Sequence, residues 1–255
     1  WSVLLPLDLR SRSELSLELL KAINNGELKL TRPTLETDSV LEPILYSEDD
    51  WIAVGSPGTT EDTGSVEVYE LVKGQWQFAE TIVPPAGTSN DRFGSSLVLD
   101  GNRLLVGSPF EDSAAPDAGA VFVYEHSTTG WVLVQTILPA NAGSQEYFGR
   151  AIALEDEVLI VGAYRRDEVA IDSGAVFVYR DTAGTFVFET TLSDPAEAEG
   201  SEFGDSVAIT DSRIVVGGPG DQSRGVGAGA MLTFTYTDSE WTPESRIESS
   251  LSGTY

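Results

Sequence analysis

Apolar and polar residues alternate with a period of two along most of the chain, and this pattern predicts β-strands. The region after residue 92 shows it best, with strands expected at 95–99, 103–106, 120–124 and 131–137. Asp100-Gly101 predicts a tight hairpin turn between the first two of these strands. Gly107-Ser108-Pro109 is expected to end the second strand, since proline cannot donate a hydrogen bond to a sheet.

The same pattern returns every 55 residues. A glycine opens the third strand of each unit, at Gly64, Gly119, Gly174 and Gly229. A Phe-Gly pair precedes the first strand of the later units, at Phe93-Gly94, Phe148-Gly149 and Phe203-Gly204. We expect these phenylalanines in the core, because the adjoining glycine lets two backbones approach closely. An aromatic residue near the start of each fourth strand is expected to pack on a neighbouring unit, with stacking on sugars as the alternative: Trp76, Trp131, Phe186 and Trp241.

Both faces of the strand expected at 120–124 are apolar, so a single four-stranded sheet of this kind could not stand alone in water. Similar sheets stacked on either side would cover both faces, as in a β-propeller. The sequence therefore predicts an all-β propeller of four-stranded antiparallel blades. A pair of β-sandwiches is the alternative, but sandwiches do not require a strict repeat.

The repeats divide residues 41–255 into four units, at about 41–92, 93–147, 148–202 and 203–255. Residues 1–40 lack the motif and are expected to be irregular, with a short helix within 11–25 and one outer strand within 26–37. Four such blades would leave an open arc. A longer chain, a second chain or a smaller closed ring would each resolve it, and part of a larger propeller is the preferred interpretation.

The run from Arg92 to Glu125 resembles the FG-GAP repeat of integrin-α-like β-propellers, in a variety with short turns. The resemblance extends from about Leu41 to the C-terminus. It implies a propeller fold with a role in adhesion, in ligand binding or as an accessory module of an enzyme. Integrin-like repeats often carry a calcium loop between the first two strands. Here the turn Asp100-Gly101-Asn102 is too short to supply the six to eight oxygens that calcium takes, so no metal site or other cofactor is expected there.

The composition excludes several partners. Asp and Glu number 41 against 15 Lys and Arg, giving a net charge of −26, so the basic footprint required for nucleic-acid binding is missing. No apolar run approaches the roughly 20 residues of a membrane helix, so membrane insertion is not expected. Cysteine is absent, and no lysine follows Lys73. This acidic, lysine-poor composition is typical of proteins secreted into salty water, which predicts an extracellular or cell-surface location.

No catalytic constellation is visible. The single histidine, His126, is expected in a solvated turn, and the many carboxylates single out no acid–base pair. Acidic loops after the second strands leave weak calcium binding open, although solvated loop charge is the simpler interpretation. Binding residues are sought where a unit departs from its own repeat. Tyr164, Arg165 and Arg166 replace the Ser-Pro or Gly-Pro of the other units, and arginine suits carboxylate, sulfate or phosphate recognition. Salt bridges to the acidic loops are the alternative.

The function predicted from the sequence is a non-catalytic extracellular module for protein or glycan binding, adhesion or scaffolding of a surface assembly. Two alternatives stay open: an accessory or catalytic domain of a carbohydrate-active enzyme, and a purely structural subunit. The expected partners are a protein or glycan ligand and, beside it, a subunit or further domain that completes the propeller.

Overall fold

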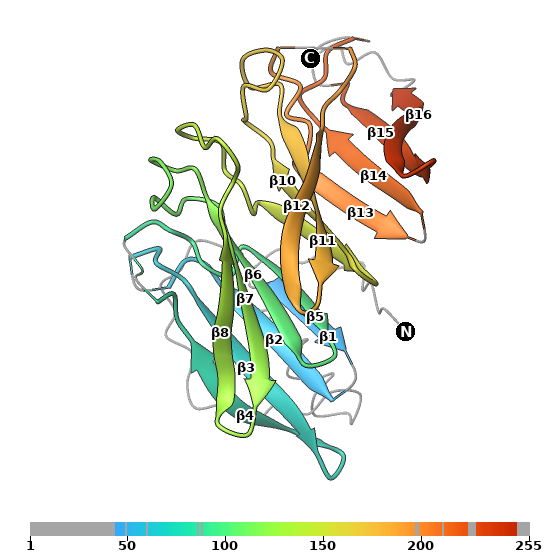
Figure 1. Ribbon diagram of the computed structural model, residues 1–255. Coiled ribbons are helices and arrows are strands. Elements are labelled where there is room, and N and C mark those ends of the chain that lie inside the picture. Colours follow the sequence, from blue (N-terminus) through green and yellow to red (C-terminus); the bar gives the residue numbers. More distant parts are fainter. Residues whose placement is uncertain are drawn as a thin grey trace.

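The computed structural model describes residues 44–248, apart from 49, 60, 86, 88, 197–198, 211 and 224–227. Within these residues all regular structure is β-strand, arranged as four sheets of four strands (Figure 1). The all-β prediction is therefore confirmed. The helix and outer strand expected within residues 1–40 lie outside the described residues.

Each sheet is a simple antiparallel meander in chain order, and we call the sheets blades 1 to 4. Blade 1 holds β1 (Ile44–Glu48), β2 (Trp51–Ser56), β3 (Ser65–Val72) and β4 (Gln75–Ile82). Blade 2 holds β5 (Ser96–Asp100), β6 (Arg103–Ser108), β7 (Ala120–Ser127) and β8 (Gly130–Ile137). Blade 3 holds β9 (Ala151–Glu155), β10 (Val158–Ala163), β11 (Ala175–Thr182) and β12 (Thr185–Leu192). Blade 4 holds β13 (Ser206–Thr210), β14 (Arg213–Gly218), β15 (Ala230–Thr237) and β16 (Glu240–Glu248).

The strands of blade 2 begin and end within three residues of the predicted positions. The expected stop after Val106 is wrong, because Gly107 and Ser108 still pair with Val121 and Ala120. The chain leaves the sheet only at Pro109, which has no N–H to donate.

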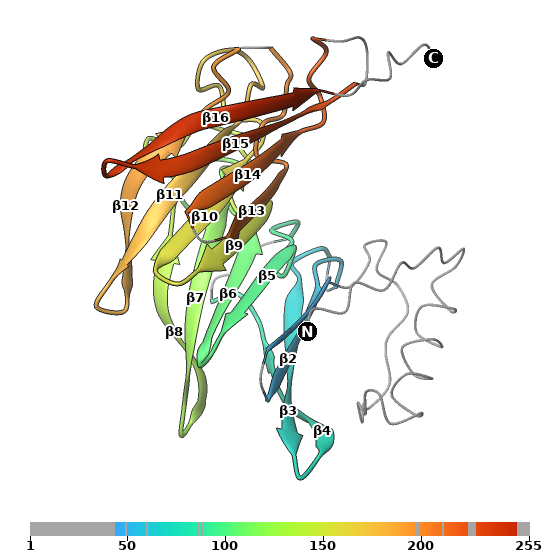
Figure 2. The same ribbon diagram turned by 90° about the vertical axis from the view of Figure 1, so that its right-hand side faces the viewer.

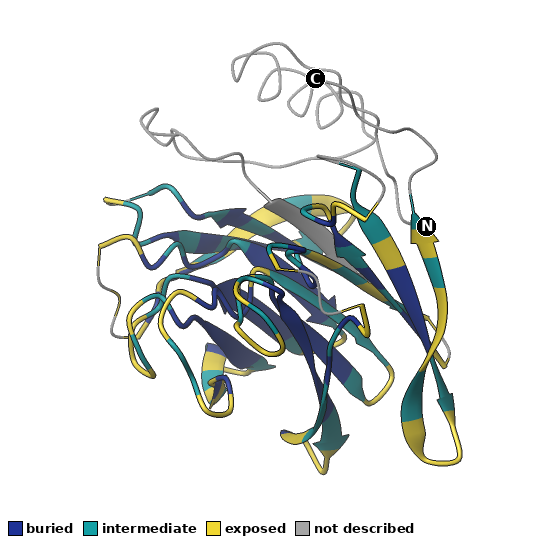
Figure 3. Cartoon of the chain, turned by 90° about the horizontal axis from the view of Figure 1, so that it is seen from above, coloured by how far each residue is buried: buried dark blue, intermediate teal, exposed yellow. Residues whose placement is uncertain are grey.

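The blades follow one another in a twisted arc, which Figure 2 shows from the side. Their first strands are in contact in the order β1, β5, β9 and β13, so these strands line the inside of the arc. The fourth strands lie on the outside. Between successive blades the facing side chains form three buried apolar clusters. Figure 3 shows this buried interior between the sheets, with exposed residues gathered at the turns. The core of the molecule therefore consists of blade-to-blade interfaces, as expected for a β-propeller.

A glycine and a phenylalanine fasten each blade to the next, and we call this contact the Gly–Phe latch. Gly119 of blade 2 forms an isolated parallel bridge with Phe148, the residue that leads into blade 3. The Phe148 N–H donates to Ala118 O at 2.9 Å. Gly119 has φ +86°, and a Cβ there would lie 2.1 Å from Phe148 O, so only glycine fits. Equivalent latches join Gly64 to Phe93 and Gly174 to Phe203. All three phenylalanines are fully buried, which confirms the core prediction.

The aromatic residues at the start of the fourth strands also pack against the preceding blade. Trp131 is 8% exposed and its ring meets Trp51 of blade 1 edge-on, with ring centroids 5.2 Å apart. Phe186 is 3% exposed and lies under the Arg103 guanidinium of blade 2, 5.2 Å from the ring centroid. For these two residues the packing prediction is confirmed.

His126 is not in a turn, contrary to expectation. It lies within β7, half-buried, with its ring 4.5 Å from that of Trp51 and 5.3 Å from that of Trp131. A β-bulge between Val123 and Tyr124 shifts the register, and pairing with β8 then continues as far as Ser127. The strand therefore runs longer than the alternation of apolar residues suggests.

Candidate binding site

Two kinds of connection meet at one end of the blades, which we call the loop end. The loop between the second and third strands of a blade lies against the linker that leads to the next blade. In blade 2 the linker N–H groups of Gln145 and Tyr147 donate to Pro116 O and Asp117 O, at 2.8 and 3.1 Å. The corresponding linker after blade 3 makes the same contacts through Gly200 and Glu202. These loops gather above the sheets in Figure 1.

A column of rings and guanidinium groups crosses the loop end from blade 2 to blade 3, and we call it the aromatic–arginine stack. Its members are Arg92, Phe110, Tyr147, Tyr164 and Arg165. The Arg92 guanidinium lies 4.3 Å from the Phe110 ring centroid. Phe110 and Tyr147 follow at 4.7 Å between centroids, and Tyr147 and Tyr164 are stacked at 5.4 Å with 20° between their planes. Arg165 ends the column, 5.8 Å from the centroid of each tyrosine.

The repeat explains how these residues meet. Arg92 and Tyr147 occupy the same repeat position, immediately before a Phe-Gly pair, and both have positive φ, 53° and 56°. Phe110 and Arg165 are likewise equivalent, each lying just beyond a second strand. The latch places the residue before each Phe-Gly pair beside the loop of the preceding blade. Side chains from successive repeats therefore come close enough to stack on one another. Of this column, the departure from the repeat pointed only to Tyr164 and Arg165. Arg92 and Tyr147 share the position before a Phe-Gly pair, which was a further signal in the sequence.

The two adjacent arginines have different environments. Arg166 is 13% exposed in its side chain and pairs with Glu146 at 2.9 Å and with Glu168 at 2.5 Å. Its guanidinium also covers the Phe177 ring at 5.0 Å. The salt-bridge interpretation therefore holds for Arg166, which anchors the loop. Arg165 is exposed, and among the described residues its contacts are ring faces rather than carboxylates.

The Tyr164 hydroxyl adds a hydrogen-bond donor beside Arg165. Burial raises the pKa of Tyr164, and the nearby Arg165 charge acts in the opposite direction without reversing the shift. The phenol therefore keeps its proton at neutral pH. Arg150, which also acts on this hydroxyl, has a half-exposed side chain and lies 3.6 Å from Asp205. A guanidinium and a phenolic O–H can each donate hydrogen bonds to a carboxylate or sulfate.

Two carboxylates of the acidic loops accept hydrogen bonds from backbone N–H groups of their own loops. Asp112 accepts the Asp117 N–H at 2.8 Å, and Asp167 accepts the Asp172 N–H at the same distance. Each bond spans five residues and closes its loop. Across the described part of the chain, no group of three or more His, Asp or Glu side chains is arranged to hold a metal ion. Weak calcium binding by these loops stays a prediction.

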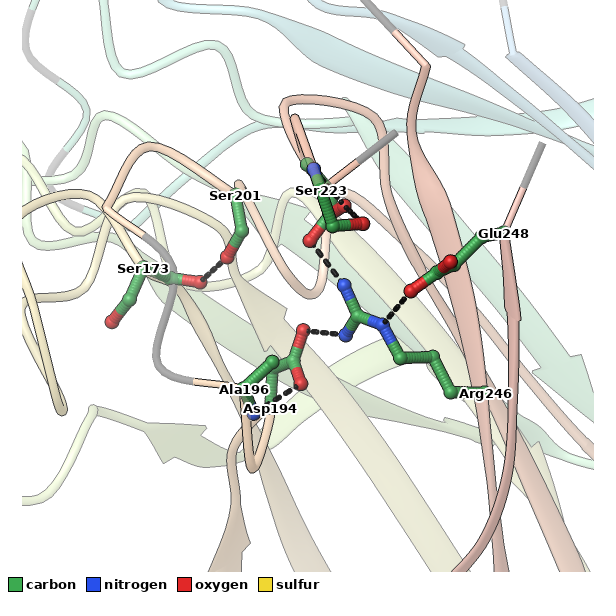
Figure 4. A network of polar contacts seen from close by, with 8 residues as sticks. Ser173, Asp194, Ala196, Ser201, Ser223, Arg246 and Glu248 are labelled. Carbon is green, nitrogen blue, oxygen red and sulfur yellow. Dashed lines mark hydrogen bonds and ion pairs between the residues drawn. The ribbon is translucent and has the colours of Figure 1, made fainter. Parts of the chain in front are cut away.

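A buried ion cluster ties blade 4 to blade 3 (Figure 4). Arg246 of β16 contacts the carboxylates of Asp194 and Asp221, and its Nε donates to Glu248 at 3.1 Å. Asp194 and Asp221 are 3% and 1% exposed. Burial alone would raise the pKa of Asp221, but hydrogen bonds from Ser223 and Arg246 outweigh it and lower that pKa. Asp221 occupies the repeat position of Arg166. The loop of blade 3 is therefore held by an arginine that pairs with a carboxylate, and the equivalent loop of blade 4 by a carboxylate that pairs with an arginine.

A hollow of about 570 Å³ lies between blades 3 and 4, near the turn that joins β9 to β10. Acidic residues of that turn, Glu155 to Glu157, form one wall, and Tyr236 and Trp241 of blade 4 form another. Arg180 Nη2 and Trp241 Nε1 are buried here without a hydrogen-bond partner among the described residues. The hollow therefore combines aromatic faces, carboxylates and two unsatisfied donors.

Four-stranded blades joined by repeated Gly–Phe latches define a β-propeller repeat protein. The family described as FG-GAP repeat matches two segments of the chain, residues 76–124 and 131–179. Each segment runs from the start of a fourth strand to the third strand of the next blade, so each contains the phenylalanine of one latch and the glycine of the next. The resemblance drawn from the sequence is confirmed for these two segments, which are FG-GAP repeats.

The chain is similar to integrin alpha-2 of Mus musculus, at 34% identity over 136 residues. It is also similar to integrin alpha-2 of Bos taurus, at 30% identity over 134 residues. Each alignment covers 45% of this chain and 11% of the integrin, so the chain spans a small part of these relatives. A solved structure of a protein from Lactobacillus plantarum has a TM-score of 0.52 at 15% identity, covering 83% of this chain and 56% of that one. That likeness supports the fold alone. None of the described residues forms a helix that could span a membrane.

Proposed function

We propose that this chain is a non-catalytic binding module of an extracellular or cell-surface protein, and that its loop end binds an anionic partner through Arg165 and Tyr164. The observation that carries the proposal is the state of Arg165. In a chain with a net charge of −26, this guanidinium is exposed and contacts ring faces, with no carboxylate among the described residues paired to it.

The stack gives the site its binding chemistry. Rings beneath a guanidinium restrict its motion, so less conformational entropy is lost when a ligand binds. The stack is itself supported by the latch and by the linker hydrogen bonds, so the donor is presented on rigid structure. A carboxylate of a protein partner, or a sulfate of a glycan, would accept hydrogen bonds from both Arg165 and Tyr164.

Similarity to integrin alpha-2 over the repeat region supports a role in adhesion with a protein partner. The acidic, lysine-poor composition supports a location outside the cell. A carbohydrate-active enzyme and a purely structural subunit remain the alternatives. Turnover of a bound polysaccharide would support the enzyme, and a chain without any ligand at the loop end would support the structural subunit.

The test uses a phage-displayed library of random dodecapeptides, with the whole chain as bait. The wild-type chain is expected to enrich peptides rich in Asp and Glu. Arg165→Glu should lose that enrichment, whereas Lys73→Glu, the same charge change in the distant β3–β4 turn, should keep it. Identical enrichment by wild type and Arg165→Glu would remove this site from consideration.

Glycan binding at the hollow between blades 3 and 4 is a second candidate, favoured by its aromatic walls beside carboxylates and unsatisfied donors. Aromatic faces stack on sugar rings while polar groups bind the hydroxyls. A glycan array separates the two sites. Neutral glycans lost on Tyr236→Ala would indicate the hollow, and sulfated glycans lost on Arg165→Glu would indicate the loop end.

A further inference from the structure

One repeat position decides how neighbouring blades meet near their first hairpin turns, and we call it the filler position. It is the first residue of the second strand, which is Trp51, Arg103, Val158 and Arg213 in blades 1 to 4. The strand register is the same in all four, since each of these residues pairs with the last residue of the preceding strand. Three of the side chains are large with a planar end, and the fourth is valine. Blade 3 therefore departs from the repeat at Val158.

In the first two interfaces, the filler side chain covers the aromatic residue that begins the fourth strand of the next blade. Trp51 meets Trp131 edge-on, with ring centroids 5.2 Å apart. Arg103 places its guanidinium over Phe186, 5.2 Å from the ring centroid. The covered residues are 8% and 3% exposed. A planar group from one blade thus closes the interface over a ring of the next.

The contacts of Arg103 show what this place offers to a guanidinium. Its Nε donates to Asp100 at 3.1 Å, and its Nη1 pairs with Asp181 of blade 3. The group therefore has carboxylates on its donors and a ring on its face. Both contacts suit arginine, because the guanidinium donors form a planar fork and its faces stack on aromatic rings.

Val158 leaves the equivalent place open between blades 3 and 4. The hollow of about 570 Å³ lies here, and Val158 and Trp241 both line it. Trp241 stands at the position of Trp131 and Phe186 but is only partly buried. The ring is kept in the third interface, and the planar group that would cover it is missing.

A second contact across the interface is lost at the same place. Glu80 of blade 1 accepts the Trp131 N–H at 2.6 Å, and Gln135 of blade 2 accepts the Phe186 N–H at 3.0 Å. The equivalent residue of blade 3 is Thr190, whose side chain is shorter. Two shortened side chains on blade 3 therefore account for the hollow.

The walls of the hollow keep groups that hold the guanidinium in the neighbouring interface. Glu155 stands at the position of Asp100, and Trp241 stands at the position of Phe186. Among the described residues, no cation lies over the Trp241 ring, since Arg180 stacks on Tyr236 instead, 5.3 Å from its centroid. The hollow thus has both a free ring face and a carboxylate.

The hollow also carries an excess of negative charge. Its acidic turn holds Glu155, Asp156 and Glu157, and none of the three forms an ion pair within the part of the chain that the structure describes. Arg180 lines the hollow as well, but Glu189 already pairs with its Nε at 2.7 Å. The surplus of carboxylates favours a cation over an anion or a neutral sugar.

We propose that the hollow binds the guanidinium of an arginine side chain from a partner protein, stacked on Trp241 and paired with Glu155. The ligand repeats, from outside, the arrangement that Arg103 makes within the chain. An indole is the ring that attracts a cation most strongly, and the carboxylate adds charge-assisted hydrogen bonds. The first turn and the loop after the second strand leave opposite ends of β10, so the hollow is separate from the loop end. Anion binding by Arg165 can therefore hold or fail independently.

The test follows the indole N–H signal of Trp241 by nuclear magnetic resonance on the whole isotope-labelled chain. Trp241→Phe assigns this signal among those of the five tryptophans. The probes are acetyl-arginine amide and acetyl-citrulline amide, which has nearly the same shape without the charge. The arginine probe should move the signal until it saturates, and the citrulline probe should bind at least about tenfold more weakly. Equal affinity for the two probes would overturn the proposal.

Two variants test whether the filler position is the cause. Val158→Arg supplies the missing guanidinium from within the chain, so it should abolish the response to the probe and raise the melting temperature. Glu155→Gln should weaken the probe at least about fivefold, whereas Glu70→Gln, the same charge change at an exposed residue of blade 1, should not. A full response in folded Val158→Arg would contradict the proposal. Equal weakening by Glu155→Gln and Glu70→Gln would reduce it to attraction by net charge.

Two further ligands identify the occupant. A Trp241 signal that moves with the neutral glycans selected on the array, and not with acetyl-arginine amide, would replace the guanidinium with a sugar. Free L-arginine separates the sources of a guanidinium. The capped probe should bind more tightly, because the carboxylate of the free amino acid is repelled by the acidic turn. Tighter binding of the free amino acid would remove the partner protein from the proposal.

Discussion

At the scale of single residues, the tightest requirement is the absence of a side chain. The latch glycines bring two backbones together where a Cβ would overlap a carbonyl oxygen, and they do so with positive φ. Each latch also positions the residue before the Phe-Gly pair, which in two of the repeats becomes a member of the aromatic–arginine stack. The latch at Gly119 therefore helps to position Tyr147, and the Tyr147 ring contacts the Arg165 guanidinium.

Gly119→Ala is expected to destabilise the protein by about 3 kcal/mol, since left-handed strain adds to overpacking against Phe148 O. Gly101→Ala is the matched control. Gly101 also has positive φ, 57°, but a Cβ there meets nothing within 4 Å, so only about 1 kcal/mol of strain is expected. Urea unfolding measures both. Equal losses would contradict the latch as a site of close packing.

Arg246→Gln is expected to cost about 3 kcal/mol at neutral pH, because Asp194 and Asp221 would stay buried without their cation. The loss depends on pH. The pKa of Asp221 is lowered below its ordinary 3.8, so its contribution is present above that value and disappears as the pH falls through the lowered pKa. Wild type and variant should therefore converge in strong acid. Stability curves from pH 7 to pH 2 check this, with the exposed Arg213→Gln as a control expected to lose far less. A constant difference at all pH values would contradict the ion pair.

At the scale of elements, the number, order and approximate bounds of the strands in blade 2 follow from the alternation of apolar residues and the spacing of Gly and Pro. The recurring glycines and Phe-Gly pairs of the latch could also be recognised in the sequence, because only glycine fits where the two backbones meet. The position of His126 could not be, since β7 stays paired with β8 as far as Ser127, beyond the apolar pattern. The stack escaped prediction because it joins side chains from separate linkers and loops, and only the packed blades bring them together.

Coverage of the blade faces predicts a gradient of stability among the strands. Blades 2 and 3 are covered on both faces, whereas the face of blade 4 that carries Met231 and Ile247 is open, with these two residues 37% and 53% exposed. We expect amide hydrogen exchange in β15 and β16 to be faster than in β7 and β11, since local opening costs less where fewer apolar contacts are lost. Exchange followed by mass spectrometry on proteolytic peptides measures this. Uniform protection in all blades would contradict the gradient and indicate that the open face is covered in solution.

At the scale of the whole molecule, repetition builds a rigid arc and departures from the repeat supply the candidate binding features. The three blade-to-blade interfaces are nearly equivalent, so departures from the repeat are recognisable by comparison. The loop end departs from the repeat at Tyr164 and Arg165. The Arg165 guanidinium is exposed there, in a chain whose net charge is −26. The loop end therefore carries the candidate surface for an anionic ligand.

The most direct test is an equilibrium titration of one enriched acidic peptide against the whole chain, by calorimetry, at fixed salt. A charge-assisted hydrogen bond contributes about 1.5–3 kcal/mol, so Arg165→Glu should weaken binding by at least about tenfold. Tyr164→Ala should weaken it as well, and Lys73→Glu should bind like wild type. Equal affinity of wild type and Arg165→Glu, with both folded by circular dichroism, would contradict the loop end as the binding surface.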